Sequence, residues 1–358
     1  MEPEPVPSPP PTLSLSYEQI HQMVTAEFSI EEGFIEYDTP TFYVKQQPTF
    51  KQAFMRLYKQ FNSKQLIPVL RKRGDRIMLQ VVSKPVTKPG NPLINIVLLL
   101  ATIGTTLFTG YFLSGDAIDP LIGAVMFSVA LMSILGAHEM GHKLTANRHG
   151  VEATYPYFIP GLPPIGTFGA VIQQKSLAPN RDALFDLGFS GPIIGFLLAV
   201  AVSLIGIPMS NVRIVYELPS GIIQPPILLD FLASILLRFP AVSVGETLLI
   251  ELHPVAYAGY IGMIVTMLNL MPVGQLDGGH VAQVLLGDKA RTVVSVIAMV
   301  SLLFIAWPMA LIAYFLSRVR HPDALDAVSP VSRTRRYASI ALIIVFALSV
   351  APVAPLFF

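Results

Sequence analysis

The sequence of 358 residues contains no cysteine. Disulfide bonds, thiolate metal sites and a cysteine nucleophile are therefore excluded, and any metal must be held by histidine, aspartate or glutamate. Charged residues are also scarce, at 13% of the chain, against about 25% in a soluble domain. The formal net charge is +1, so no excess of positive charge indicates binding to nucleic acid.

The few charges are unevenly distributed along the chain. Residues 1–90 hold 20 of the 47 charged side chains, which leaves 27 for the remaining 268 residues. A soluble fold of that size could not cover its surface with so few charges. The sequence therefore predicts three parts: a Pro-rich disordered tail at 1–13, a small soluble α+β domain at 14–88, and a transmembrane domain at 89–358.

The small domain shows both helical and strand periodicity. Apolar residues recur at helical spacing in two segments and alternate with polar residues in four others. We expect helices at 14–28 and 50–61, and strands at 34–38, 41–44, 66–70 and 77–82. The last two strands flank Arg73-Gly74-Asp75, which predicts a hairpin.

Long stretches without Asp, Glu, Lys or Arg follow Pro89-Gly90. Each approaches or exceeds the roughly 18 apolar residues that indicate a spanning helix. The stretches are 89–115, 120–138, 187–212, 252–276, 292–317 and 337–358. The predicted fold class is a membrane all-α core of about six transmembrane helices with a short membrane-associated β segment. Lysine and arginine residues after the second stretch favour a cytosolic N-terminal domain.

The second apolar stretch ends in His138-Glu139-Met140-Gly141-His142. On a helix, positions i and i+4 lie on the same face, so both imidazoles can bind one metal ion. The glutamate can reach water at that metal and act as its general base. Such side chains in an apolar helix are costly to bury unless they are paired or ligated. The pattern therefore predicts a catalytic zinc site with His138 and His142 as ligands and Glu139 as the catalytic residue.

A catalytic zinc ion needs a third protein ligand from another segment. Asp277 is the preferred candidate, because it follows an uncharged stretch and stands in a run of glycine and proline residues that would break the helix. The other candidates for this position are His280, Glu152, Asp182 and Asp186.

Cleavage of a peptide bond requires an extended substrate, because a helix hides its backbone. Residues 166–172 are β-branched and glycine-spaced, so they could form an edge strand that pairs with an unwound substrate or an ordinary loop strand. Asn269 could stabilise an oxyanion or only satisfy helix backbone. The candidate substrate-binding residues are Gly166, Thr167, Phe168, Gly169, Ala170, Val171 and Asn269.

These motifs resemble those of the site-2 protease family of intramembrane zinc metallopeptidases, over a catalytic core at 91–290. The resemblance rests on the motif at 138–142, the segment 166–172, Gly188-Phe-Ser-Gly-Pro192 and Gln275-Leu-Asp-Gly-Gly279. The sequence departs from the usual family pattern Asn-Pro-Asp-Gly at one position. Leu276 stands where that pattern has proline, which affects the shape of the loop before Asp277.

The resemblance implies one Zn²⁺ per chain, bound by His138, His142 and Asp277, with Glu139 as general base. It implies hydrolysis of peptide bonds within or near the transmembrane segments of membrane-anchored proteins, as in regulated intramembrane proteolysis. The expected partners are single-span membrane protein substrates and the lipid bilayer. The archaeal, cyanobacterial and plastid branch of the family, which has a soluble N-terminal domain, is the most similar. We expect a multi-pass protein in the cell membrane of a prokaryote.

Other functions could use the same residues. A metal-cation carrier would need the His and Asp site but not Glu139. A serine protease of the rhomboid type would use Ser190 with His253 or His280 as its base, although close helix packing accounts better for the small residues around Ser190. The complete set of His, Glu, His and Asp argues against a catalytically silent relative. The oligomeric state is not predicted by the sequence.

Overall fold

The computed structural model describes residues 15–85, 90–115, 118–217, 224–305 and 323–351. The disordered tail predicted at 1–13 lies outside these residues. The chain divides into two compact units. The first contains the residues up to Pro89 together with Leu177–Arg181 and Asp323–Pro330, and the second contains the rest.

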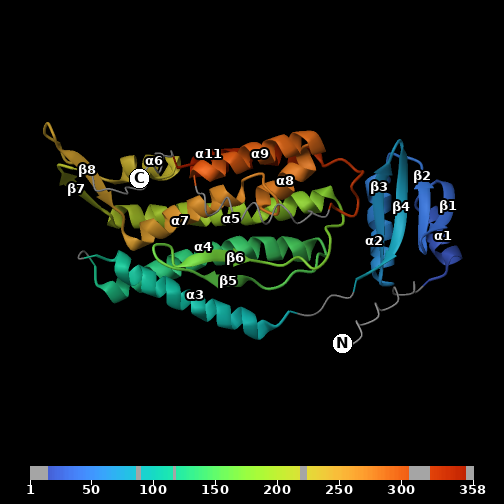
Figure 1. Ribbon diagram of the computed structural model, residues 1–358, viewed down its shortest axis with the longest axis horizontal. Coiled ribbons are helices and arrows are strands. Elements are labelled where there is room, and N and C mark those ends of the chain that lie inside the picture. Colours follow the sequence, from blue (N-terminus) through green and yellow to red (C-terminus); the bar gives the residue numbers. More distant parts are fainter. Residues whose placement is uncertain (1–14, 86–89, 116–117, 218–223, 306–322, 352–358) are drawn as a thin grey trace, which may run out of the picture. The chain divides into compact units, whose positions relative to one another are not determined.

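The first unit is built on a four-stranded antiparallel sheet with the strand order β1-β2-β4-β3 (Figure 1). Its elements are α1 (Tyr17–Thr25), β1 (Ile30–Glu36), β2 (Thr39–Val44), α2 (Phe50–Asn62), β3 (Leu66–Arg73) and β4 (Arg76–Ser83). A capping box begins α1, in which the side chains of Ser16 and Gln19 each accept a hydrogen bond from the other's backbone N–H. The helix is shorter at both ends than the range 14–28 expected from periodicity.

One face of α2 forms the core of this unit. The residues of that face are Phe50, Phe54, Leu57, Tyr58 and Phe61, and all are buried. They belong to one hydrophobic cluster with Phe42, Leu70 and Leu79 of the sheet. Burying a large apolar side chain contributes about 1.5–3 kcal/mol, so this face holds the helix on the sheet.

Two later segments of the chain complete the first unit. The N–H of Leu70 in β3 donates to the carbonyl of Leu325 at 2.8 Å, and the N–H of Ala327 donates back to Leu70 at 3.3 Å. Leu325 in turn donates to the carbonyl of Ala178 at 2.9 Å. Segments Asp323–Pro330 and Leu177–Arg181 therefore continue the sheet beyond β3 as short parallel bridges. The side chain of Leu325 is 2% exposed and joins the hydrophobic cluster.

Arg71 fixes the first of these segments by side-chain hydrogen bonds. Its Nη1 lies 2.8 Å from each of the carbonyl oxygens of Ala324 and Leu325. Burial lowers the pKa of the Arg71 guanidinium, and the nearby carboxylates of Asp323 and Asp326 act in the opposite direction. Arg71 is therefore half-buried against the segment that it binds.

Helices dominate the second unit. They are α3 (Pro92–Leu113), α4 (Pro120–Arg148), α5 (Arg181–Gly206), the 3-10 turn η1 (Ile207–Met209), α6 (Ile227–Leu236), α7 (Pro254–Asn269), α8 (Asp277–Leu285), α9 (Asp288–Ile305) and α11 (Arg333–Ser349). Two antiparallel hairpins are added, β5 (Tyr157–Pro160) with β6 (Thr167–Val171), and β7 (Asn211–Val215) with β8 (Thr247–Glu251). Helix α4 packs against α3 and α7, and the β5-β6 hairpin lies along α3 and α4 (Figure 1).

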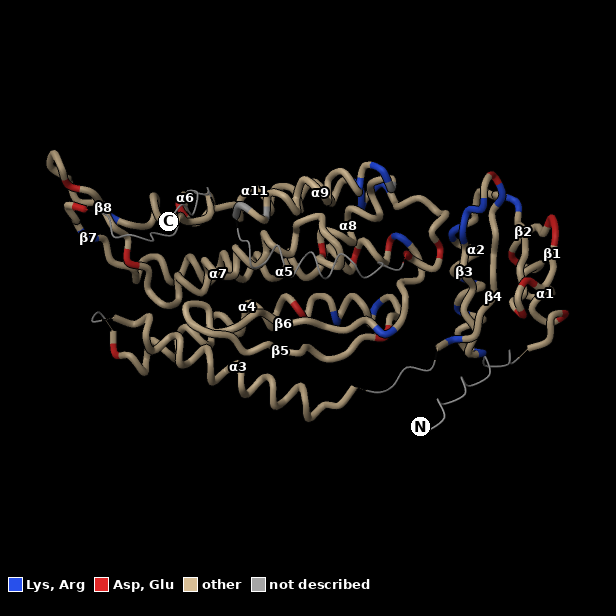
Figure 2. The backbone as a smooth tube through the Cα atoms, viewed as in Figure 1, with Lys and Arg blue, Asp and Glu red and all other residues tan. Residues whose placement is uncertain are grey.

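Three helices in the described residues are long and apolar enough to cross a membrane: α3, α4 and α5 with its continuation to Met209. Charged residues are sparse along them (Figure 2). This number is smaller than the six spans expected from uncharged stretches. The stretch 252–276 contains Pro272, so its helix α7 ends at Asn269 after 16 residues. The stretch 187–212 is already counted through α5, and parts of 292–317 and 337–358 lie outside the described residues.

Replacing Arg71 by alanine tests the attachment of Asp323–Pro330. We expect faster hydrogen exchange at the backbone amides of Leu325 and Ala327, because the variant leaves the carbonyls of Ala324 and Leu325 without their charged donor. Arg73→Ala is the matched control on the same strand. Arg73 pairs with Glu36 at the surface, and exposed ion pairs contribute little to stability. Equal exchange in the two variants would contradict the role assigned to Arg71.

Candidate metal centre

Helix α4 places His138, Glu139 and His142 inside the second unit. The helix begins at Asp119, whose side chain accepts from two backbone N–H groups, and Pro120 follows as its first residue. His138, Glu139 and His142 are 4%, 5% and 7% exposed. The spacing of four residues puts both imidazoles on one face of the helix, as predicted from the sequence.

Asp277 supplies a carboxylate to the same point. It is the first residue of α8, and its Oδ2 lies 3.4 Å from Nε2 of His138 and 3.3 Å from Nε2 of His142. The two Nε2 atoms are 3.1 Å apart. Ligands at about 2.0–2.2 Å from a tetrahedral zinc ion are separated by about 3.3–3.6 Å. The triangle is therefore close to the size that zinc requires, and these three side chains can hold one metal ion.

A backbone carbonyl on α5 orients His142. Nδ1 of His142 lies 2.8 Å from the carbonyl oxygen of Leu187. Because a carbonyl only accepts, Nδ1 must carry the proton, and Nε2 is left with a lone pair directed at His138 and Asp277. This carbonyl could not be identified from the sequence, since a backbone group has no side-chain signature.

Glycines on α5 allow this close approach. A Cβ added at Gly191 would overlap the imidazole of His142, and one at Gly195 would lie 2.9 Å from Nδ1 of His138. A Cβ at Gly188 would lie 2.8 Å from the backbone oxygen of Asp277. The three glycines follow at spacings of three and four, so one face of α5 covers all three ligands. The spacing of these glycines is visible in the sequence and indicates close helix packing. The side chains that pack against them could not be predicted from it.

The same segment contains Ser190, the nucleophile of the alternative serine-protease hypothesis. Its Oγ donates to the carbonyl of Leu187 at 3.4 Å, within its own helix. His253 is the N-cap of α7, where its Nδ1 accepts from the N–H of Val255 at 3.2 Å. Both side chains are therefore engaged locally, and helix packing explains the small residues around Ser190.

Two glycines let Asp277 approach from the end of α7. A Cβ at Gly278 would overlap the carbonyl of Leu270, and one at Gly279 would overlap the carbonyl of Gly274. The turn between α7 and α8 is packed against the first residues of α8, so the carboxylate is placed by the shape of this turn. Leu276, which replaces the proline of the usual family pattern, is the N-cap residue of α8 in extended conformation.

Glu139 lies beside the ligand triangle without belonging to it. Its Oε1 is 4.0 Å from Nε2 of His138. The backbone N–H of Ile172, the residue that follows β6, lies next to its carboxylate. The carboxylate therefore stands between the metal ligands and the end of a strand, in a position to exchange a proton with water in that gap.

The candidate substrate-binding residues lie mainly on β6. The strand pairs with β5 from Tyr157↔Val171 to Pro160↔Thr167, and within the described residues the sheet has only these two strands. Phe168 and Val171 are 68% and 51% exposed, whereas Thr167 is buried and donates to the carbonyl of Ile159. Gly166 precedes the strand with φ +81°. Nδ2 of Asn269, at the end of α7, lies 3.2 Å from Nε2 of His138.

The rival third ligands are engaged elsewhere. Asp182 and Asp186, in the first turns of α5, both bind Arg335 of α11, with Asp186 at 2.6 and 2.7 Å and Asp182 at 3.0 Å. Asp186 also accepts from Nε2 of His149, the C-cap residue of α4, at 2.8 Å. This network joins the ends of α4, α5 and α11, and was not predicted from the sequence. Glu152 and His280 are outside the group of possible metal ligands.

Comparison with known proteins is consistent with this site. The family model described as "Peptidase family M50" matches residues 126–308, just over half of the chain, and includes all four residues of the site. "Probable zinc metalloprotease EGY1, chloroplastic" of Arabidopsis thaliana is 30% identical over 311 residues, which cover 76% of this chain and 56% of that protein. "Probable zinc metallopeptidase EGY3, chloroplastic" of Arabidopsis thaliana is 31% identical and covers 72% and 48%.

The protein of Oryza sativa subsp. japonica named "Probable zinc metalloprotease EGY1, chloroplastic" is 27% identical, with 78% of this chain and 54% of that protein covered. The chain thus spans about half the length of the curated relatives that it matches. No solved structure matches the chain.

Replacing Gly191 by alanine tests the glycine face of α5. The added methyl group must displace the imidazole of His142, so we expect zinc affinity to fall about 10–100-fold, as when the partner of a ligating histidine is disturbed. Gly104→Ala on α3 is the matched control, because a Cβ there meets no atom within 4 Å. Zinc content of the two purified variants, titrated against a chelator, gives the comparison. Equal affinities would show that the glycine face does not position His142.

Asp277→Asn tests the third ligand. The amide keeps the size of the side chain but loses the charge that a zinc site with two neutral histidines requires, so we expect a larger loss of bound zinc than in Glu152→Gln. Metal analysis after dialysis against a chelator measures both. Full zinc occupancy in Asp277→Asn, or an equal loss in Glu152→Gln, would reject Asp277 in favour of another third ligand.

Proposed function

The chain belongs to peptidase family M50, and on that premise we propose that it is a zinc-dependent endopeptidase. We propose that it hydrolyses peptide bonds within or near the transmembrane segments of membrane-anchored proteins, in regulated intramembrane proteolysis. The single observation that carries the proposal is the buried triangle of His138, His142 and Asp277 with the carboxylate of Glu139 beside it. The relatives named as zinc metalloproteases also support the proposed function.

Each residue of the site has a defined task in this chemistry. His138, His142 and Asp277 would hold the zinc ion, which would supply Lewis-acid activation of water and of the scissile carbonyl. Glu139 takes the proton of the attacking water on its carboxylate and returns it to the leaving amine. The Nδ2 group of Asn269, next to His138, is a donor for the developing oxyanion.

An exposed strand edge suits an extended substrate. Residues 166–171 precede Ile172, whose backbone lies next to Glu139, so a substrate strand paired along β6 would pass the catalytic carboxylate. Pairing of this kind supplies main-chain hydrogen bonds to a segment that would otherwise stay helical. We propose that β6 binds single-span membrane protein substrates in this way, with the lipid bilayer around them.

The membrane setting is part of the proposal. Helices α3, α4 and α5 support a membrane protein, and we propose about six spans in total, with the α+β domain of the N-terminal part in the cytosol. Lys143, Arg148 and Lys175 follow the apolar part of α4 and favour a cytosolic side there. We propose the cell membrane of a prokaryote as its location; the plant relatives carry the word chloroplastic in their names.

Glu139→Gln separates a peptidase from a metal-cation carrier. Glutamine keeps the size of the side chain but cannot accept the proton of water, so cleavage of a single-span reporter should fall by about 10²–10⁴-fold. Zinc content should stay at the wild-type level, because Glu139 is not one of the three ligands. His138→Ala is the control that loses both zinc and cleavage. Cleavage by Glu139→Gln near the wild-type rate would reject the metallopeptidase mechanism, and zinc transport by that variant in vesicles would support the carrier.

A further inference from the structure

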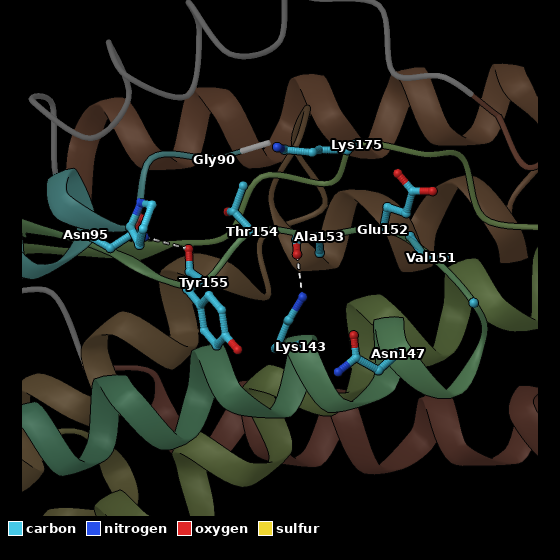
Figure 3. Close-up of a pocket in the computed structure, with 12 residues that line it drawn as sticks. Gly90, Asn95, Lys143, Asn147, Val151, Glu152, Ala153, Thr154, Tyr155 and Lys175 are labelled. Carbon is cyan, nitrogen blue, oxygen red and sulfur yellow. Dashed lines mark hydrogen bonds between the residues drawn. The ribbon is translucent and has the colours of Figure 1, made fainter. Parts of the chain in front are cut away.

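A cavity of about 720 Å³ opens beside the last turns of α4. Its wall is formed by the start of α3, by α4, and by the chain at 150–155 and 175. Its polar side chains include Lys143, Lys175, Asn95, Asn147 and Glu152 (Figure 3). We call this cavity the lysine pocket. The lysine pocket has no part in the roles assigned above to the residues of the metal site.

The lysine pocket lies in line with the catalytic carboxylate along α4. Glu139, Lys143 and Asn147 follow at intervals of four residues, so they share one face of the helix. One helical turn advances about 5.4 Å. The pocket therefore begins one turn beyond Glu139, on the same face, and continues for a second turn.

The chain at the base of the β5-β6 hairpin leads from Glu139 to the lysine pocket. Ile172 lies next to Glu139, and the carbonyl of the next residue, Gln173, accepts from the N–H of Thr154 at 3.0 Å. The N–H of Lys175 then donates to the carbonyl of Glu152 at 2.7 Å. Three residues in extended chain span about 10 Å. A peptide that follows this strand past Glu139 thus reaches the lysine pocket within two to four residues.

Hydrogen-bond donors dominate the polar lining. Lys143 donates to the carbonyl of Ala153 and lies 5.5 Å from the ring centre of Tyr155, so its ammonium group is held at the wall (Figure 3). Asn95 donates to the carbonyls of Tyr155 and Pro156. The pocket thus has two ammonium groups, Lys143 and Lys175, against the one carboxylate of Glu152. A carboxylate is the ligand that such a lining stabilises by charge-assisted hydrogen bonds.

We propose that the lysine pocket binds an acidic side chain of the substrate, two to four residues from the scissile bond. This inference rests on the proposed peptidase function, and it identifies the substrates as membrane-anchored segments that carry Asp or Glu beside the cleavage site. The shared face with Glu139 and the strand from Ile172 favour a peptide over a phospholipid headgroup, since both features lead along the path of the peptide chain.

Equilibrium binding tests the pocket separately from catalysis. The probes are single-span reporters with Asp, Asn or Lys at each position two to four residues on either side of the cleavage site, in phosphatidylcholine vesicles. They are titrated against zinc-loaded Glu139→Gln protein that carries Lys175, Lys175→Gln or Lys175→Glu. At one position we expect the Asp reporter to bind about tenfold more tightly than the Asn reporter, as one charge-assisted hydrogen bond provides. Lys175→Glu should reverse the preference in favour of the Lys reporter.

Arg148→Gln is the matched control, because Arg148 is exposed at the end of the same helix and does not line the cavity. It should leave the preference for Asp unchanged. Binding that is independent of reporter charge at every position overturns the inference, while cleavage by the wild-type protein would still support the proposed function. The converse result, charge-dependent binding without cleavage by the wild-type protein, keeps the pocket and rejects the peptidase.

Vesicles that contain 20% phosphatidylglycerol test whether the pocket binds a phospholipid headgroup and not a peptide carboxylate. If the affinity changes with this lipid, and the change is abolished by Lys175→Glu but is the same for all reporters, the pocket binds phospholipid and the inference is wrong. A preference for Asp that persists in both vesicle compositions supports a peptide carboxylate.

Discussion

The second unit is organised by the approach of two imidazoles and one carboxylate to a single point. His138, His142 and Asp277 come from two helices and are mostly withdrawn from water. Ionisable side chains in an apolar bundle are unfavourable without a partner, and one bound cation would be a common partner for all three. The close contacts of α5 with α4, and the tight turn before α8, are the steric conditions under which these three side chains can meet.

Local spacing explains which parts of the site were predictable. His138, Glu139 and His142 lie within two turns of one helix, so their common placement follows from helical periodicity alone. Asp277 was identified because glycine and proline residues mark a break in an uncharged stretch. The carbonyl of Leu187 carries no such mark, because any residue has a carbonyl. Gly191 and Gly195 suggested close packing, but a glycine does not reveal the group that occupies the space it leaves.

The same distinction applies to the fold. The strands and the hairpin at Gly74 were predictable because alternation and turn residues are local signals, although several boundaries shifted by a few residues. Hydropathy does not register a helix end such as the one at Asn269, so an uncharged stretch alone does not define the length of a helix. Backbone pairing between β3 and Leu325 was not predictable, since it depends on main-chain groups that are distant in sequence.

That pairing imposes an order of assembly on the chain. Arg71 and Leu325 are 254 positions apart, so during synthesis β3 is complete long before the segment that covers its outer edge has been made. An unpaired strand edge is a template for wrong association, and closing so long a loop carries an entropic cost. The first unit, although N-terminal, is therefore among the last parts to finish folding. By the time it is complete, α5 and α7 have already left the ribosome.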